Sequence, residues 1–346
     1  MRAEPRRSSQ TLRAPANLSQ CLRRPITSEL DRRRFLGWSA FASASFLAGC
    51  SASPGREAAP ENRTVRYDYE SFTGRIPADP QRVLVIEGRA DLEFALTCGY
   101  PVFASGFYFG QEGALLDEMQ ELMPADLETI GFADSGEPDH ELIASLGPDL
   151  IIMRQNAYSS DFYGNSRLEE VAPVLAVESG STGWQDAMRE QARMLERDEA
   201  VDEEIARYNE LTETIRERSG EELSRMSLIC GTAMDTAGML VITNSLGNEV
   251  ATDLGIEVPM YDPTDEEGSY ELSEENLGDL ADVGTLAVFA FEERPALGQS
   301  EAFRRLPAAQ NERVFNLDLT LNQGLARAAC ALARQLEEMA APGGAG

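Results

Sequence analysis

The stretch IASLGPDLIIM, residues 143–153, decides the fold of this chain. A helical segment that opens near Glu137-Pro138-Asp139 ends at Gly147-Pro148, and the uninterrupted apolar run Leu150–Met153 follows at once. Proline cannot continue a helix, and a short apolar run after such a turn is typical of a strand buried on both faces. The stretch therefore predicts a helix that leads into a buried strand.

The same succession of strands and helices continues on both sides of this stretch. In the first half we expect strands at Thr64–Phe72, Arg82–Ile86, Pro101–Ser105, Glu128–Gly131 and Val174–Val177, a turn near Gly74 and Pro77, and helices at Asp91–Cys98 and Leu115–Met123. In the second half we expect strands at Ser227–Cys230, Met239–Thr243, Val283–Phe291 and Arg313–Asn316, and helices near Ser245–Leu254, Glu301–Leu306 and Leu325–Met339. Alternation at this spacing predicts parallel α/β sheets.

A long polar helical region from Trp184 to about Ser219 separates the two halves. Its apolar residues recur at spacings of four and three and form one stripe: Val201, Ile205, Tyr208, Leu211 and Ile215. We predict an α/β protein of two lobes, residues 75–184 and 221–340, joined by a linking helical region at 185–220. A ligand would bind in the cleft between the lobes, beyond the carboxyl ends of the strands. One long helix is a stiff hinge, so we expect little opening and closing.

The first 49 residues have the features of an export signal. A basic run, Arg32-Arg33-Arg34, precedes Phe35-Leu36 and a short apolar stretch that ends in Leu47-Ala48-Gly49-Cys50. The first motif resembles the twin-arginine signal and the last resembles a bacterial lipobox. We expect residues 1–49 to be removed, Cys50 to be lipidated, and residues 50–74 to form a flexible tether to the outer face of the bacterial cytoplasmic membrane.

The charge balance and the single histidine exclude several classes of protein. The chain has a formal charge of −29, and residues 1–49 hold nine Arg against three acids, so the remainder carries −35. A body this acidic repels phosphates, which excludes a nucleic-acid binder. His140 is the one histidine, so sites built from several histidines are excluded, and we expect His140 to be an exposed surface residue rather than a metal ligand.

The order of these segments resembles the substrate-binding lipoproteins of ABC transporters for iron-siderophore complexes, a class shared with vitamin B12-binding proteins. The motifs that carry the resemblance are DPQRVLV at 79–85, ADLEFAL at 90–96, EPD at 137–139, IASLGPDLII at 143–152, LSEENL at 272–277 and RRLPAAQNERV at 304–314. Together they cover nearly all of residues 75–340. The resemblance implies two Rossmann-like lobes bridged by a single helix, and binding without catalysis.

The resemblance also implies how the protein meets its transporter. Members of this class dock on the permease through one carboxylate on each lobe, and by motif position these would be Glu137 and Glu275. A carboxylate forms directional pairs with arginine, which suits this role. The alternative is that both acids simply favour a helix N-terminus, and Glu274 competes with Glu275. The implied partners are a permease with its cytoplasmic ATPase.

Candidate ligand-binding residues follow the ends of the expected strands. They are Arg89, Tyr108, Arg154, Tyr158 and Arg294. Arginine can donate to the metal-bound oxygens of a ferric siderophore, and aromatic rings can pack against its faces. Arg154 is the strongest candidate, because a charge directly after a buried strand needs a reason. Arg89 could instead pair with Asp91.

The ligand class stays open at this stage. We favour a ferric siderophore, with no cofactor, no catalytic residues and no metal held directly by the protein. The same fold could instead bind cobalamin or haem, for which Tyr108, Tyr158 or Tyr261 would be the axial ligand. A secreted α/β enzyme is a third reading, but no nucleophile or acid pair in the sequence supports it. The acidic surface, rich in Arg and without Lys, is explained either by a GC-rich genome or salty surroundings, or by a cationic ferric hydroxamate as ligand, whereas the arginines point to an anionic catecholate.

Overall fold

The computed structural model describes residues 63–133, 135–179, 183–234, 237–243, 245–259, 269–290 and 295–341. The expected export signal, Cys50, Tyr261 and Arg294 lie outside these ranges. None of the helices in the described ranges combines the length and the hydropathy that a membrane span requires.

The first lobe contains a five-stranded parallel sheet, as the sequence predicts. Its strands stand in the order β5-β4-β3-β6-β7. The strands are β3 (Val83–Val85), β4 (Val102–Gly106), β5 (Glu128–Ile130), β6 (Leu150–Arg154) and β7 (Val174–Val177). The helices are α1 (Ala90–Thr97), α2 (Ala114–Met119), α3 (His140–Leu146), α4 (Gln155–Ser159) and α5 (Asn165–Val171). All residues of β3, β6 and β7 are buried, because helices cover both faces of the sheet.

A separate hairpin precedes this sheet. β1 (Thr64–Tyr69) and β2 (Phe72–Pro77) pair antiparallel across a two-residue turn in which Glu70 has a φ of +50°. The turn therefore lies at Glu70-Ser71, and the expected turn near Gly74 is wrong, because Gly74 pairs with Tyr67 inside the hairpin. The turn divides the expected strand Thr64–Phe72 into β1 and the start of β2, and the expected tether range 50–74 overlaps the hairpin.

The second lobe has a mixed sheet in the order β10-β9-β8-β11-β12. Its strands are β8 (Leu228–Ala233), β9 (Met239–Ile242), β10 (Ser269–Leu272), β11 (Thr285–Ala290) and β12 (Val314–Asp318). Its helices are α8 (Leu246–Asp253), η1 (Glu274–Leu280), α9 (Pro295–Gln299), α10 (Glu301–Arg304), α11 (Pro307–Gln310), η2 (Leu319–Gln323) and α12 (Ala326–Ala340). β8, β11 and β12 are parallel, but β9 is antiparallel to β8 and to β10. The five residues that connect β8 and β9 are too few for a parallel crossover.

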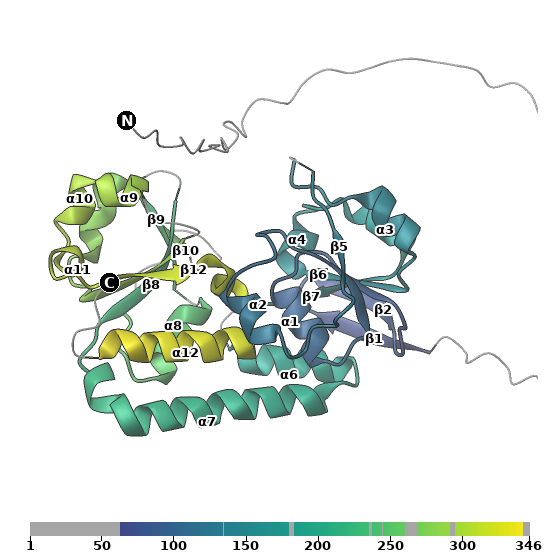
Figure 1. The fold of residues 1–346 in the computed structure, drawn as a ribbon, viewed down its shortest axis with the longest axis horizontal. Coiled ribbons are helices and arrows are strands. Elements are labelled where there is room, and N and C mark those ends of the chain that lie inside the picture. The colour runs from purple at the N-terminus through teal and green to yellow at the C-terminus, as the bar shows by residue number, and fades with distance from the viewer. Residues whose placement is uncertain are drawn as a thin grey trace, which may run out of the picture. The chain divides into compact units, whose positions relative to one another are not determined.

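The linking region consists of two helices, α6 (Trp184–Met194) and α7 (Asp198–Leu223). The chain breaks between them at Glu196, where φ is +59°. The 26 residues of α7 run beneath both lobes in Figure 1, a length of about 39 Å at 1.5 Å per residue. Four residues of the predicted stripe are buried and Leu211 is half-buried, which confirms the expected apolar face. Trp184 is buried against Tyr208, with ring centroids 5.2 Å apart.

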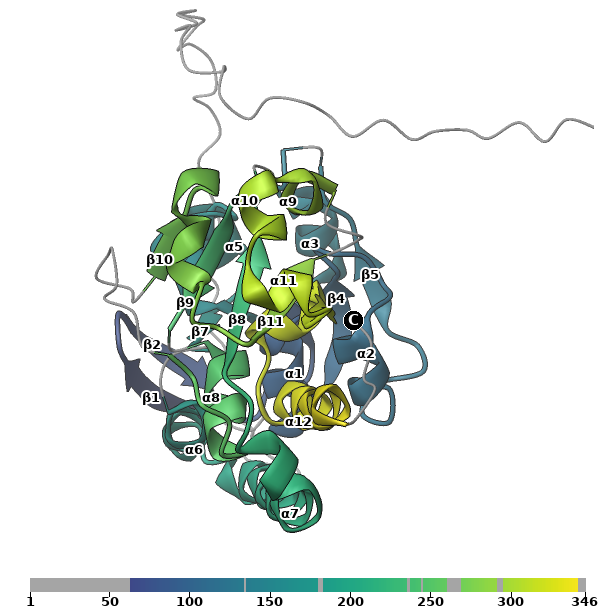
Figure 2. The ribbon, with the colours of Figure 1, turned by 90° about the vertical axis from the view of Figure 1, so that its left-hand side faces the viewer.

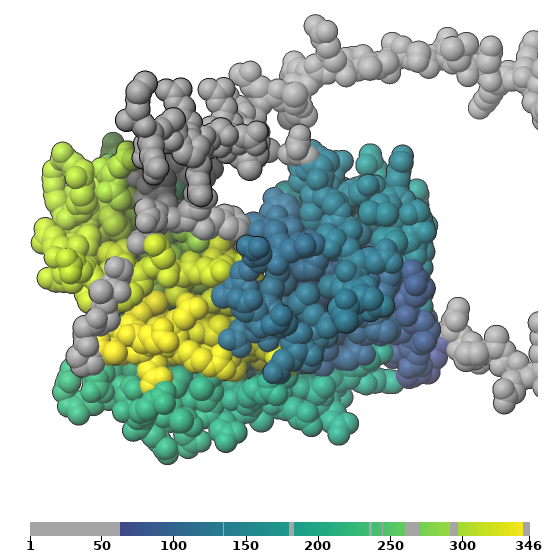
Figure 3. Space-filling view, in the orientation of Figure 1, coloured from purple at the N-terminus to yellow at the C-terminus, as the bar shows by residue number. Residues whose placement is uncertain are grey.

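The C-terminal helix α12 strengthens the bridge between the lobes. It packs along α7 and also contacts α2 of the first lobe and α8 of the second, and the two orthogonal ribbon views show α12 beside α7 (Figures 1 and 2). In the space-filling view its yellow surface lies between α7 and the blue surface of the first lobe (Figure 3). One apolar core accordingly runs from the first lobe through α6, α7 and α12 into the second.

Two short contacts join the lobes directly. The backbone N–H of Ala114 donates to the Asp318 carboxylate at 2.9 Å, and that of Leu115 donates to the Thr320 hydroxyl at 3.2 Å. A side chain at Gly113 would place its Cβ 2.7 Å from Thr320, and the φ of +144° there also favours glycine. The start of α2 is thus fixed to the end of β12.

Candidate ligand-binding site

The candidate site lies where the first sheet reverses its strand order. From β3 the chain continues to β4 and β5 on one side of the sheet, and then to β6 and β7 on the other. In open α/β sheets the carboxyl ends of the two strands at such a reversal form a crevice that binds ligands. The residues that directly follow β3 and β6 are therefore the first to inspect.

The loop after β3 is held rigidly by a buried carboxylate. Asp91 is fully buried, and its oxygens accept from the backbone N–H groups of Glu87 and Arg89, each at 2.8 Å. Burial raises the pKa of Asp91 to about 6. The loop after β4 approaches closely, because the N–H of Tyr108 donates to the Glu87 carbonyl at 2.9 Å. A Cβ at Gly88 would lie 2.1 Å from the Gly106 carbonyl, so only glycine permits this approach.

A buried ion pair forms the floor of the site. The Arg154 guanidinium, at the end of β6, donates through Nε and Nη2 to the two oxygens of Glu87, the second at 3.1 Å. Their side chains are 10% and 1% exposed. Burial opposes the charge, but the attraction of Glu87 outweighs it and raises the pKa of Arg154. Nη1 of Arg154 has no hydrogen-bond partner within the described ranges. Nη1 is thus the nitrogen of this guanidinium that is not bonded to the protein in those ranges.

Aromatic side chains surround this floor. The pocket of about 150 Å³ is lined by Glu87, Tyr108, Arg154, Asn156, Ala157, Ser160, Phe162 and Tyr163. Tyr108 and Phe162 are 37% and 49% exposed, and they are the exposed large apolar side chains of the described residues. Their ring centroids lie 6.1 Å apart, and both pack edge-on against Tyr163. A volume of 150 Å³ holds one ring-sized group, and the exposed rings extend the surface beyond it.

Arg89 lies beside the pocket and connects the lobes. It is 5% exposed, its guanidinium stacks on Phe109 at 4.1 Å, and its Nη2 donates to the Asn322 side chain of the second lobe at 2.5 Å. Burial and then the repulsion of Arg154 lower the pKa of Arg89 to about 10, so it stays charged at neutral pH. The structure thus brings together three of the five candidate ligand residues: Arg89, Tyr108 and Arg154.

Tyr158 does not line this pocket. Its hydroxyl donates to Glu169 of α5 at 2.7 Å, and its ring packs edge-on against Phe72 at 4.9 Å. Glu87, Phe162 and Tyr163 line the pocket instead and were not among the sequence candidates. An aromatic pair inside the polar loop after α4 was the signal for Phe162 and Tyr163. Nothing in the sequence pattern indicated Glu87.

The two expected docking carboxylates are exposed, one on each lobe. Glu137 precedes α3 and lies 3.9 Å from Arg167 in a pair that is mostly exposed. It is outside the helix, whose N-cap is Asp139, so a helix-capping role does not explain it. Glu275 is exposed in η1 next to the exposed Glu274.

His140 is half-buried rather than exposed, which corrects the sequence expectation. Its Nε2 lies 2.8 Å from the Tyr163 carbonyl oxygen, so the ring braces the loop behind the pocket. Among the described residues, no three His, Cys, Asp or Glu side chains gather in a group that could hold a metal ion.

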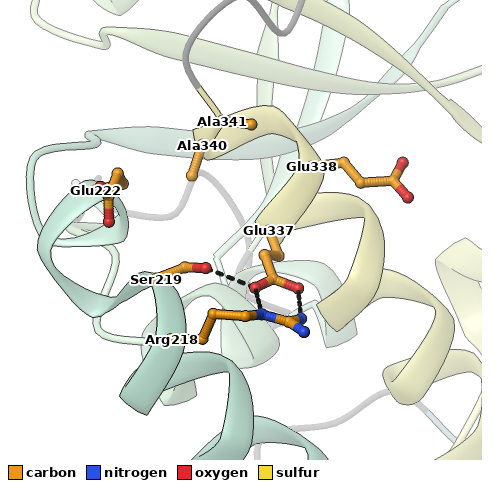
Figure 4. Close-up of a pocket in the computed structure, with 7 residues that line it drawn as sticks. All are labelled: Arg218, Ser219, Glu222, Glu337, Glu338, Ala340 and Ala341. Carbon is orange, nitrogen blue, oxygen red and sulfur yellow. Dashed lines mark hydrogen bonds and ion pairs between the residues drawn. The ribbon is translucent and has the colours of Figure 1, made fainter.

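A second pocket, between the C-terminal ends of α7 and α12, has a structural explanation. Arg218 and Ser219 of α7 both donate to Glu337 of α12, with Nε and the hydroxyl at 2.8 and 2.6 Å from Oε1 (Figure 4). The hydrogen bond from Arg218 lowers the pKa of Glu337. These polar groups satisfy one another, so the pocket joins two helices and leaves no converging donors for a ligand.

Two sheet lobes bridged by one long helix, with an aromatic and arginine-lined pocket at the strand ends, define the class of helix-bridged substrate-binding proteins. The profile of the periplasmic binding protein family matches residues 116–320, more than half of the sequence, and the chain belongs to that family. Members of this family are extracytoplasmic substrate-binding proteins rather than enzymes, and they carry a ligand rather than a cofactor. No curated protein sequence matches the chain.

Solved structures share the fold at low sequence identity. The siderophore periplasmic binding protein from the fuscachelin gene cluster of Thermobifida fusca is 23% identical, with a TM-score of 0.54 over 76% of this chain and 97% of that one. A binding-protein component of a ferrichrome ABC transporter from Bacillus subtilis is 16% identical, with a TM-score of 0.58 over 76% and 98%. The Fe³⁺-Desferal-bound FhuD from Vibrio cholerae is 19% identical, with a TM-score of 0.56 over 76% and 100%.

Proposed function

We propose that this protein is a lipid-anchored, extracytoplasmic binding protein that captures a ferric siderophore and delivers it to the permease of an ABC importer. The observation that carries the proposal is the pocket at the sheet's reversal point, where exposed Tyr108 and Phe162 stand over the buried guanidinium of Arg154. A ferric siderophore presents metal-bound oxygens on a broad and partly apolar body. One donor below and flat rings beside it match that chemistry. The similar folds are consistent with this ligand class.

The test is titration of the purified protein by calorimetry with ferric trihydroxamate, ferric tris-catecholate, ferric citrate, cobalamin and haemin. We expect saturable binding of a ferric siderophore at submicromolar concentration and none of the iron-free chelator. Tyr108→Ala and Phe162→Ala should each weaken binding by about tenfold, because each removes a stacking surface. Their thermal unfolding should be nearly unchanged, since both rings are partly exposed. Saturation by cobalamin or haemin alone would contradict the proposed cargo.

Delivery is proposed to depend on Glu137 and Glu275, which are exposed on different lobes. Each carboxylate would pair with arginines of the permease and so set the orientation of the bound protein. Glu137→Ala and Glu275→Ala should lower uptake of the iron complex by cells at least about fivefold. Ligand affinity of the purified variants should be that of the wild type. Normal uptake by both variants would contradict the docking role.

A further inference from the structure

The charges at the floor of the pocket cancel. Two guanidinium groups, Arg89 and Arg154, are matched by two buried carboxylates, Glu87 and Asp91. The Glu87 carboxylate accepts from Nε and Nη2 of Arg154, so it neutralises the cation that lines the pocket. Among the described residues, the floor of the pocket therefore has arginine without a net positive charge.

This balance limits what a ligand can gain from Arg154. Three negative charges placed against this floor need compensation by net positive charge, and its balanced charges do not supply it. Nη1 of Arg154 and Nε of Arg89 are buried and have no partner in the described part of the chain. Of the two arginines only Arg154 lines the pocket, and a single donor suits an oxygen of a chelate whose charge is already balanced by its iron. The surrounding rings are uncharged, and residues 50–346 carry a formal charge of −35, which repels anions further.

We propose that the pocket selects ferric chelates without net negative charge, such as trihydroxamates, and that Glu87 is the residue that sets this preference. The inference rests on the proposed function, because it assigns the charge class of the same ligand. The acidic surface and the buried arginines favour ligands of opposite charge, and this inference agrees with the surface. Glu87 acts through Arg154 and is a specificity-determining residue of this site.

The first experiment uses the unmodified protein and two probes, an uncharged ferric trihydroxamate and a ferric tris-catecholate of charge −3. We expect the trihydroxamate to bind at least about 100-fold more tightly, and its affinity to change less than about twofold between 50 and 500 mM salt. Equal or tighter binding of the tris-catecholate would overturn this inference and leave the proposed function standing. Binding of neither probe would overturn this inference, and if ferric citrate did not bind either, the proposed function would fail with it.

The second experiment assigns the preference to Glu87. Glu87→Gln keeps the shape and a hydrogen-bond acceptor but leaves Arg154 uncompensated, so the preference for the uncharged chelate should fall by about tenfold. Glu170→Gln is the matched control, because Glu170 is exposed on α5 and makes the same change of charge away from the pocket. Circular dichroism tests whether the variant is folded. If it is not, the ratio of the two probe affinities measured on the wild type still decides the charge class. An unchanged ratio in folded Glu87→Gln would overturn the assignment.

Discussion

Burial decides how much a charged side chain contributes to the stability of the fold, and two arginines of the first lobe show this difference. Arg154 pairs with Glu87 where both side chains are almost completely buried. Arg167 faces Glu137 at 3.9 Å where both are more than half exposed. Water screens the second pair, whereas loss of either partner in the first leaves a charge without solvent or counter-ion.

Arg154→Met should therefore lower the free energy of unfolding by about 3 kcal/mol, because it leaves the Glu87 carboxylate buried and unpaired. Arg167→Met, the matched surface substitution, should change it by less than about 0.5 kcal/mol. Urea unfolding followed by circular dichroism measures both. Equal decreases in the free energy of unfolding in the two variants would show that the buried ion pair contributes no more to stability than the exposed one.

The sequence singles out Arg154 as a ligand-binding candidate, because a charge directly after a buried strand needs a reason. It does not predict the ion pair. The partner, Glu87, is 67 residues away, and only the strand order β3-β6 brings the two together. The sequence indicates Tyr158, which does not line the pocket, because spacing along the chain does not determine which side of the short helix α4 faces the pocket. Pairing across a sheet and the orientation of a short helix both depend on tertiary packing.

At the scale of elements, the apolar pattern located most strands but not their direction. β7 lies where the sequence placed it, and β6 extends one residue further, to Arg154. β10 was not predicted, and β9 is antiparallel, because the short connection after β8 forces the chain to turn back. The polar linking region was expected as one helix, but Glu196 breaks it where Arg197 stacks on Tyr100 of the first lobe at 4.0 Å.

Two helices distant in sequence are joined by one buried carboxylate. Glu93 of α1 is fully buried, and it accepts from the backbone N–H groups of Leu325 and Arg327 at the start of α12, at 2.8 and 2.6 Å. Arg327 continues the network, donating to Glu204 of α7 and to the Glu118 carbonyl of α2, both at 2.8 Å. The N–H donors favour the ionised carboxylate, but burial outweighs them and raises the pKa of Glu93 to about 7.

This raised pKa predicts a pH dependence of stability. Between about pH 4.5 and 7 the folded protein holds a proton on Glu93 that the unfolded chain has released, so the stability from Glu93 is present at low pH and is lost as the pH rises through 7. Relative to Glu93→Gln, wild type should lose about 1 kcal/mol per pH unit across this window. Urea unfolding at several pH values measures the difference, because other carboxyl groups contribute equally to both proteins. A flat difference for Glu93→Gln would contradict the prediction.

At the scale of the folded body, the lobes share more than the hinge that the sequence predicted. Apolar periodicity showed that one long helix bridges them, but it contained no sign of the contacts that bypass this helix. These are the bonds from α2 to Asp318 and Thr320, from Arg89 to Asn322, and from Glu93 to the start of α12. Each joins residues more than 200 positions apart, and they appear only once both lobes have folded.

These contacts predict that the lobes open little, with or without ligand. The amides of Ala114 and Leu115 donate across the lobe interface, so in hydrogen exchange they should stay protected in the ligand-free protein. Asp318→Ala removes the acceptor of Ala114, and should speed exchange of peptides covering residues 113–119 by about tenfold while peptides from α1 stay unchanged. Asp282→Ala, an exposed acid of the second lobe, is the matched control. If these amides exchanged as fast in the ligand-free wild type as in Asp318→Ala, the lobes would be separating freely. The prediction that the lobes open little would then be wrong.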